Sequence, residues 1–121
     1  MMKLKSLTNE QLQYAVRTGE FGSDVTASRQ KVAVVMTQDW CSDWMRMESW
    51  LRNTVGCDDD LDIYLVVYNK LDCFQDFLRL KENQWRNDQI PYVRYYENGS
   101  LFQVTNAVPR DVFFRIFGLV L

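Results

Sequence analysis

The stretch VVMTQDWCSDWMRM, Val34 to Met47, joins an apolar run to a Trp-Cys pair and then to a helix-forming segment. Its apolar run belongs to a continuous β-branched segment, Lys31 to Thr37, which is typical of a strand covered on both faces. Apolar residues then recur at helical spacing, at Trp44, Met47 and Leu51. The stretch predicts a strand followed by a helix from about Cys41 to Thr54, with a thiol at the helix N-terminus.

The remaining elements alternate between helix and strand. Thr8 and Gln11 form a capping box, which predicts a short first helix, and GEFGSDVTASRQ, residues 19–30, is expected to be a loop. LDIYLVVYN, residues 61–69, predicts a second buried strand. Asp72 with Gln75 is expected to cap a helix that ends near Gln84.

The C-terminal third predicts a hairpin and a last helix. YVRYYENGSLFQV, residues 92–104, reads as two strands joined at Asn98-Gly99. Pro109 is expected in the first turn of a helix whose inner face is Val112, Phe113, Ile116, Phe117 and Val120. Phe114 and Leu119 are then left over, which favours a tightly packed helix or a dimer contact. Two parallel strands and an antiparallel hairpin in one sheet, flanked by helices, predict a single α/β domain over residues 1–121.

Composition narrows the classes of function. The chain has 121 residues, 47% of them apolar, which is enough for one sizeable core. Its net charge of −2 gives no attraction to nucleic acid or to an anionic membrane surface, so neither is an expected partner. No leader-like or membrane-spanning run is recognised, and we therefore expect a cytoplasmic protein, either a monomer or a weak homodimer.

The cysteine and histidine counts limit the chemistry further. An odd number of cysteines, three, argues against a secreted disulfide framework and for reduced thiols. The absence of histidine from the sequence excludes Cys-His catalysis and zinc sites that use histidine. The spacing of the cysteines does not match a zinc knuckle either, so no metal or other cofactor is expected.

Four motifs in order resemble the thioredoxin-like family, from about Lys31 to Leu121. They are WC between strand and helix, the LDIYLVVYN strand, IPY at the start of the next strand, and ENG at the hairpin turn. DWCSDW is most similar to the branch with the motif W-C-x-D-C, with Asp43 retained and Trp44 in place of the second cysteine. The resemblance implies a thioredoxin-like fold, with a central mixed sheet of parallel strands and a C-terminal antiparallel hairpin, flanked by helices.

The same resemblance implies where a substrate would bind. The Ile90-Pro91 peptide is expected to be cis and to lie across from Cys41, in a groove lined by Trp40, Cys41, Ile90, Pro91 and the loop at Asn106 and Ala107. The sequence departs from the family pattern at several positions. Ala107 stands where glycine is usual, Ser49 replaces a helix-kinking proline, Val35 replaces a buried acid, and Val66 replaces a strand lysine.

Cys41 has two interpretations. Unpaired backbone N–H groups and the positive end of the helix dipole favour a thiolate at this position, which would attack disulfides. Asp39 and Asp43 lie within a turn and disfavour it through like charge. Alternatively, Cys41 is an unreactive remnant beneath Trp40 and Trp44, and the domain serves for packing or recognition.

A reactive Cys41 would work as a monothiol, since a dithiol reductase needs a second thiolate to release the mixed disulfide. Cys57, past the far end of the helix, is too distant to serve. Cys73 is a possible resolving thiol, because the segment after the second strand emerges at the same sheet edge as Cys41. Otherwise an external thiol such as glutathione would resolve the adduct, formed on a protein or small disulfide. The alternative is a non-catalytic binding module that holds a protein or peptide partner in the same groove.

Overall fold

A four-stranded mixed sheet forms the centre of the computed structural model, which describes residues 4–54 and 58–119. Its strand order is β2-β1-β3-β4, and its strands are β1 (Lys31–Thr37), β2 (Leu61–Val67), β3 (Tyr92–Glu97) and β4 (Ser100–Thr105). β1 and β2 are parallel, whereas β3 is antiparallel to both β1 and β4. The predicted mixed sheet of parallel strands and a C-terminal hairpin is confirmed.

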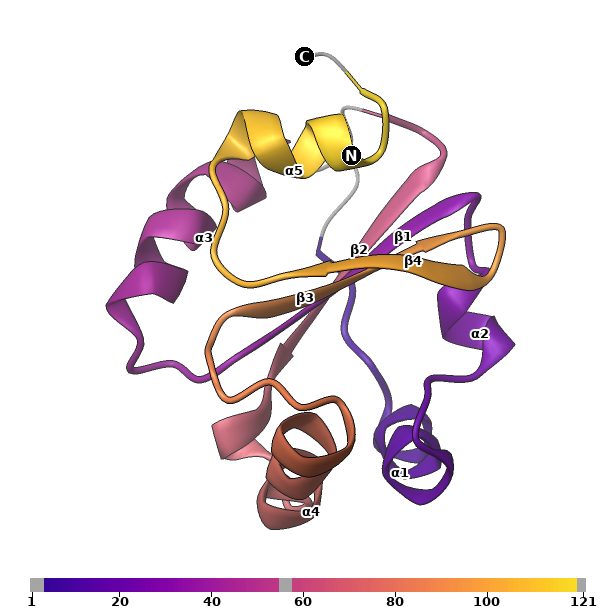
Figure 1. Cartoon of the computed structure of the whole chain (residues 1–121), viewed down its shortest axis with the longest axis vertical. Helices are drawn as coiled ribbons and strands as arrows, with labels where there is room; N and C mark the ends of the chain where they lie inside the picture. Colours follow the sequence, from indigo (N-terminus) through magenta and orange to yellow (C-terminus); the bar gives the residue numbers. More distant parts are fainter. Residues whose placement is uncertain (1–3, 55–57, 120–121) are drawn as a thin grey trace.

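Helices cover both faces of this sheet (Figure 1). The helical elements are α1 (Asn9–Thr18), α2 (Ser23–Thr26), α3 (Ser42–Thr54), the 3₁₀ turn η1 (Tyr68–Lys70), α4 (Phe74–Arg79), the π-helical turn η2 (Leu80–Gln84) and α5 (Arg110–Ile116). α3 and α5 lie on one face, and α1 and α4 lie on the other (Figure 1). Within the described residues, no helix is long and apolar enough to cross a membrane.

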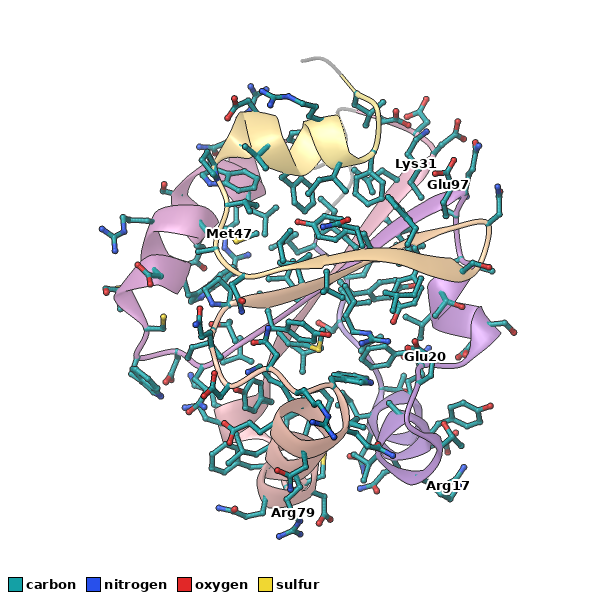
Figure 2. The ribbon with its side chains drawn as sticks, viewed as in Figure 1. Arg17, Glu20, Lys31, Met47, Arg79 and Glu97 are labelled. Atoms are coloured by element: carbon teal, nitrogen blue, oxygen red, sulfur yellow. The ribbon has the colours of Figure 1, made fainter. Side chains whose placement is uncertain are left out.

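The apolar core is divided by the sheet into two clusters. Because successive strand residues point to opposite faces, Val32, Val34 and Met36 pack toward α1 and α4, whereas Ala33 and Val35 pack toward α3 and α5. β1 is buried from Val32 to Thr37, as expected for a central strand covered on both sides. Met47 of α3 lies between that helix and the sheet, and the paired residues Lys31 and Glu97 close one end of the sheet (Figure 2).

The N-terminal region contains one confirmed and one missed element. The capping box of α1 is present: Gln11 N–H donates to Thr8 Oγ1 at 3.1 Å, and Thr8 N–H donates to Gln11 Oε1 at 2.8 Å. The expected loop at residues 19–30 instead contains the single-turn helix α2. One turn offers too few residues for a helical period to be visible, so the sequence pattern could not reveal it.

The helix after β2 begins without the expected cap. Asp72 was predicted to cap it together with Gln75, but the residue that precedes the first turn is Cys73. No side-chain hydrogen bond caps α4 in the part of the chain that the structure describes. The predicted end near Gln84 is reached through the π-helical turn η2.

The last helix is buried on a wider arc than predicted. Phe113 and Phe117 are buried as expected, and Pro109 is the residue immediately before the helix. Phe114, predicted to be left over, is only 1% exposed, and its ring centroid is 6.5 Å from that of Trp50 on α3. α5 therefore packs against α3 as well as against the sheet, which agrees with the tightly packed helix that was one of the two expectations for this segment. Val120 lies outside the described residues.

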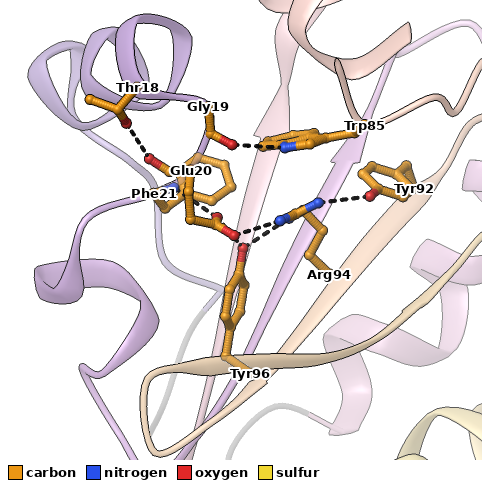
Figure 3. A network of polar contacts seen from close by, with 8 residues as sticks. All are labelled: Thr18, Gly19, Glu20, Phe21, Trp85, Tyr92, Arg94 and Tyr96. Atoms are coloured by element: carbon orange, nitrogen blue, oxygen red, sulfur yellow. Dashed lines mark hydrogen bonds and ion pairs between the residues drawn. The ribbon is translucent and has the colours of Figure 1, made fainter. Parts of the chain in front are cut away.

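A buried polar network lies on the face of β3 that packs toward α1 and α4, and no pattern in the sequence predicted it (Figure 3). The Arg94 guanidinium donates to Glu20 Oε2 at 2.5 Å, to Tyr96 Oη at 2.9 Å and to Tyr92 Oη at 3.0 Å. The guanidinium also stacks on Trp85, 4.1 Å from the ring centroid. An arginine in a strand covered by helices is tolerated here because every one of these neighbours offers it an acceptor or an aromatic face.

Candidate thiol site at the start of helix α3

Cys41 stands at the turn from β1 into α3. Its carbonyl oxygen accepts a hydrogen bond from Met45 N–H at 3.1 Å, which makes Cys41 the residue immediately before the first turn of α3. Its Sγ donates to the carbonyl oxygen of Ile90 at 3.6 Å, and the Ile90-Pro91 peptide bond is cis. The structure therefore brings together Cys41, Ile90 and Pro91, three of the residues that the resemblance assigned to one groove.

The two tryptophans around Cys41 differ in exposure. Trp44, one turn into α3, is 4% exposed and packs in the same core cluster as Cys41, which is itself 7% exposed. Trp40 is 65% exposed, and its Nε1 donates to Gln38 Oε1 at 2.7 Å. Gln38 Nε2 in turn donates to Tyr68 Oη at 3.2 Å, so Trp40 is tethered at the surface. Of the two indoles, only that of Trp44 is buried together with the Cys41 thiol.

Each acid expected to oppose a thiolate has a cationic partner. Asp39 Oδ1 accepts from Asn69 Nδ2 at 2.8 Å, and Asp39 Oδ2 lies 3.3 Å from Lys70 Nζ. The Asn69 hydrogen bond and the Lys70 ammonium both lower the pKa of Asp39. Asp43 forms an ion pair with Arg46, one turn along α3. The negative charge beside Cys41 is thus locally balanced.

Asn69 and Lys70 were missed as site residues, although a signal for them was available. They form η1, directly after β2, and β2 runs parallel to β1. The carboxyl ends of adjacent parallel strands meet at the same edge of a sheet, so residues after β2 belong beside the turn that carries Asp39. Applying that rule to polar residues, as well as to cysteines, would have placed them here.

A pocket opens beside the thiol site, between α3 and the loop before α5. Its volume is about 290 Å³, and it is lined by Asp43, Arg46, Met47, Trp50, Ala107, Val108 and Pro109. Asp43 and Ala107, both predicted as site residues, therefore face one cavity from different elements. Ala107 is exposed, so its methyl group lies on the open side of this surface.

The site lacks the acid that the resemblance assigned to the position of Val35. Val35 is fully buried and belongs to the same core cluster as Cys41. Its partner in β2 is Leu65, whereas Val66 packs on the opposite face of the sheet. A buried carboxylate does exist in β2, at Asp62, but this residue lies at the opposite end of the strand from the thiol edge.

Cys73 lies in the other core cluster, among side chains of β2, α1 and α4. It is a free thiol that is 5% exposed, and burial raises its pKa. The structure places Cys73 and Cys41 in different core clusters, on opposite faces of the sheet. Cys57 lies outside the described residues.

The described residues contain no group of three or more Cys, Asp, Glu or His side chains arranged to hold a metal ion. The groups that the site presents are its thiol, the backbone carbonyls beside it and the charged pairs around them. These features define a thiol at a helix N-terminus opposite the residue before a cis-proline.

Solved structures share the fold of this chain at low sequence identity. No protein-family model matches the sequence, and no curated protein sequence matches it either. Thioredoxin O2 from Arabidopsis thaliana, in the oxidized state, superposes with a TM-score of 0.69 at 10% identity, over 97% of this chain and 93% of that one. The short form of spinach chloroplast thioredoxin f has a TM-score of 0.68 at 14% identity, over 96% and 91%.

A third similar structure is Trxlp from Edwardsiella tarda, with a TM-score of 0.58 at 17% identity, over 94% of this chain and 96% of that one. In all three comparisons the likeness covers nearly the whole of both chains. At these identities it establishes the architecture: the chain has the thioredoxin fold.

Proposed function

We propose that this protein carries out thiol–disulfide exchange as a monothiol, through Cys41. The observation that carries the proposal is the position of Cys41 Sγ, before the first turn of α3 and 3.6 Å from the carbonyl oxygen of Ile90. Backbone N–H groups at a helix start stabilise a negatively charged sulfur. The balanced charges of Asp39 and Asp43 support the proposal, because they reduce the repulsion that would oppose a thiolate.

The reaction proceeds in two exchange steps. Cys41 loses its proton to solvent, and the thiolate attacks one sulfur of a substrate disulfide. A bond forms between Cys41 Sγ and that sulfur, the substrate S–S bond breaks, and the leaving thiolate takes up a proton. An external thiol of the glutathione class then attacks the substrate sulfur of the mixed disulfide, which releases reduced Cys41 and a new disulfide.

The surface around the thiol suits an extended protein segment or a small disulfide. Trp40 and Met45, 65% and 54% exposed, present apolar side chains on either side of Cys41 in the sequence. The backbone at Ile90 and Pro91 lies against the thiol and would align with substrate backbone. The pocket that contains Asp43 and Ala107 extends this surface toward α5.

Adduct formation with a small disulfide tests the proposal. Incubation with glutathione disulfide should add one glutathione to the protein, which peptide mass spectrometry should locate at Cys41 and excess reduced glutathione should remove. Cys41→Ser should form no such adduct. An adduct confined to Cys57 or Cys73, or no adduct at all, would overturn the proposal.

A second candidate function is that of a non-catalytic binding module. The observation that favours it is the 7% exposure of Cys41 beside the buried indole of Trp44, because a shielded thiol is a poor nucleophile. In this function Trp40, Met45 and the groove contact a protein or peptide without covalent chemistry. It predicts that wild type and Cys41→Ser bind such a partner equally well in excess reductant, and that glutathione disulfide leaves Cys41 unmodified.

A further inference from the structure

The segment that brings Ile90 and Pro91 to the thiol is held by the side chain of a residue from another element. Asn106 follows the end of β4, and its Nδ2 donates to the carbonyl oxygens of Pro91 at 3.1 Å and Gln89 at 3.3 Å. The carbonyl between these two, that of Ile90, accepts from Cys41 Sγ. Of these three successive carbonyl groups, the outer two accept hydrogen bonds from Asn106, and the middle one accepts from the Cys41 thiol.

Asn106 is itself held by a reciprocal amide pair. Its Nδ2 donates to Asn87 Oδ1 at 2.9 Å, and Asn87 Nδ2 donates to Asn106 Oδ1 at 3.1 Å. Asn87 Oδ1 also accepts from Gln89 N–H at 3.0 Å. The pair uses both ends of each amide, so Asn87 and the turn that it stabilises determine the orientation of Asn106. The two N–H groups of Asn106 Nδ2 are shared among Asn87 Oδ1 and the two backbone carbonyl oxygens.

A buried lysine anchors Asn87. Lys81 Nζ donates to the carbonyl oxygen of Asn87 at 2.8 Å, and Asn87 N–H donates back to the carbonyl oxygen of Lys81 at 3.1 Å. Lys81 is fully buried in η2, with its ammonium 5.7 Å from the centroid of the Tyr92 ring. Lys81 is itself buried, so the chain of contacts from Lys81 to Asn106 connects the thiol site to the interior of the fold.

We propose that Asn106, held through Asn87 by Lys81, is a positioning residue for the reaction of Cys41 with disulfides. By binding the carbonyls on both sides of Ile90, it fixes the direction of the Ile90 carbonyl and the path of the backbone at Pro91. A substrate chain aligned on that backbone then meets Cys41 Sγ at a defined distance and angle, which exchange requires. This inference rests on the proposed function.

The chemistry of the contacts dictates the informative substitutions. Asn106→Asp replaces the NH₂ donor with an oxygen that would face the carbonyls of Gln89 and Pro91, whereas Asn106→Ala removes the contacts without adding repulsion. Gln103→Ala is the matched control, because it removes an amide from β4 whose hydrogen bond is local, to Val104 at 3.2 Å.

The experiment compares two reactions of Cys41 in each variant. One is mixed-disulfide formation with a synthetic peptide that carries a disulfide, which needs alignment on the backbone at Pro91. The other is alkylation by iodoacetamide, which needs only an accessible thiolate. We expect Asn106→Asp and Asn106→Ala to slow the first reaction by about 10-fold or more and the second by less than about two-fold. Gln103→Ala should change neither.

The outcomes separate this inference from the proposed function. If wild type forms no Cys41 adduct with the peptide, the proposed function fails. If wild type reacts and the Asn106 variants react equally fast, exchange stands and the positioning role is overturned. An equal loss in both reactions also overturns it, because it would indicate a general change at the thiol. Asn87→Ala, which removes the reciprocal pair and the contact with Gln89 N–H, should show the same selective loss if the Asn106 variants do not fold.

Discussion

Cys41 Sγ lies 3.6 Å from the carbonyl oxygen of Ile90, and it donates a hydrogen bond to that oxygen. A thiol can donate a hydrogen bond only while it carries its proton, so this contact is lost when Cys41 becomes a thiolate. When the proton leaves, the carbonyl oxygen and the sulfur both carry negative charge, and the backbone N–H groups at the start of α3 become the stabilising neighbours. The reactivity of Cys41 depends on the balance between these two sets of groups and the nearby ion pairs.

The ion pair between Asp39 and Lys70 should support the reactivity of Cys41. Lys70→Met leaves the Asp39 carboxylate without its cation, so we expect alkylation of Cys41 at neutral pH to slow by about two- to five-fold at low ionic strength. The effect should shrink in high salt, because both side chains are substantially exposed. Alkylation rates of wild type and variant at two salt concentrations provide the measurement.

Arg79→Met serves as the control for this charge effect. Arg79 is an exposed cation at the outer surface of α4, paired with Asp76 (Figure 2), so its loss changes the net charge equally without touching the Asp39 pair. An equal slowing in both variants would show that net charge, and not the Lys70 pair, controls the thiol.

The same pair gives a pH dependence of stability. The pKa of Asp39 is lowered in the folded state by Asn69 and Lys70, so its contribution is present above about pH 4, its unfolded pKa, and is lost as the pH falls through the folded value. Lys70→Met should therefore weaken this acid dependence, and Arg79→Met should leave it in place. Urea unfolding between pH 3 and pH 6 would detect the difference.

Restoring a second cysteine tests whether the remaining groups of the site are competent. In Trp44→Cys the new thiol lies one helical turn from Cys41, where it can attack a mixed disulfide and release the substrate. We expect this variant to gain insulin reduction and to lose on the order of 3 kcal/mol of stability, because the buried indole leaves a cavity. Trp44→Ser has a similar cavity without the thiol and should stay inactive. A Trp44→Cys variant that forms the disulfide yet fails to reduce insulin would indicate that Val35, in place of an acid, limits proton transfer.

The Arg94 network should be a major source of stability, independent of Cys41. Glu20→Gln leaves the buried guanidinium without its counter-charge (Figure 3). We expect a loss of about 1–3 kcal/mol in unfolding free energy, below the ~3–5 kcal/mol of a fully buried pair, because the Glu20 side chain is 40% exposed. The double variant Glu20→Gln, Arg94→Met should recover part of the loss, and additive losses would contradict this account. Neither variant should alter Cys41 alkylation.

Tyr95 should make the protein sensitive to alkaline pH. Burial raises the pKa of Tyr95 to about 12, from 10.0, and the hydroxyl exchanges a hydrogen bond with Thr105 at 2.7 Å. Because the folded pKa is the higher one, the stabilising contribution is complete below pH 10 and is lost as the pH rises toward 12. Tyr95→Phe should reduce the fall in stability between pH 10 and pH 12. The control Tyr14→Phe, at an exposed tyrosine, should not. Urea unfolding from pH 8 to pH 11 measures both, and parallel curves for wild type and Tyr95→Phe would contradict the expectation.

The strand and helix periodicities were sufficient to predict the sheet, its mixed topology and the placement of Cys41. A long β-branched run such as residues 31–37 has few alternatives to a buried central strand. Two kinds of feature were not predicted from the sequence. Single-turn elements such as α2 contain less than one repeat of any pattern, and the burial of Phe114 depends on the angle at which α5 meets α3, which the sequence of α5 does not contain.

The polar contacts of the site were not predicted from the sequence, for a related reason. Asp39 and Lys70, like Asn87 and Asn106, come from separate elements and meet because of the topology of the sheet. The sequence shows that Asp39 is close to Cys41 along the chain, but it does not show that Lys70 neutralises the Asp39 carboxylate.

A reactive Cys41 can be detected by the rate of iodoacetamide alkylation of Cys41 and Cys73 in one sample, followed from pH 5 to pH 10 by peptide mass spectrometry. Cys73 is an internal reference, because burial raises its pKa. We expect Cys41 to be alkylated readily at neutral pH, and Cys73 to react only under more alkaline conditions. Alkylation of Cys41 that is no faster than that of Cys73 at any pH would contradict a reactive Cys41 and leave binding as the function of the groove.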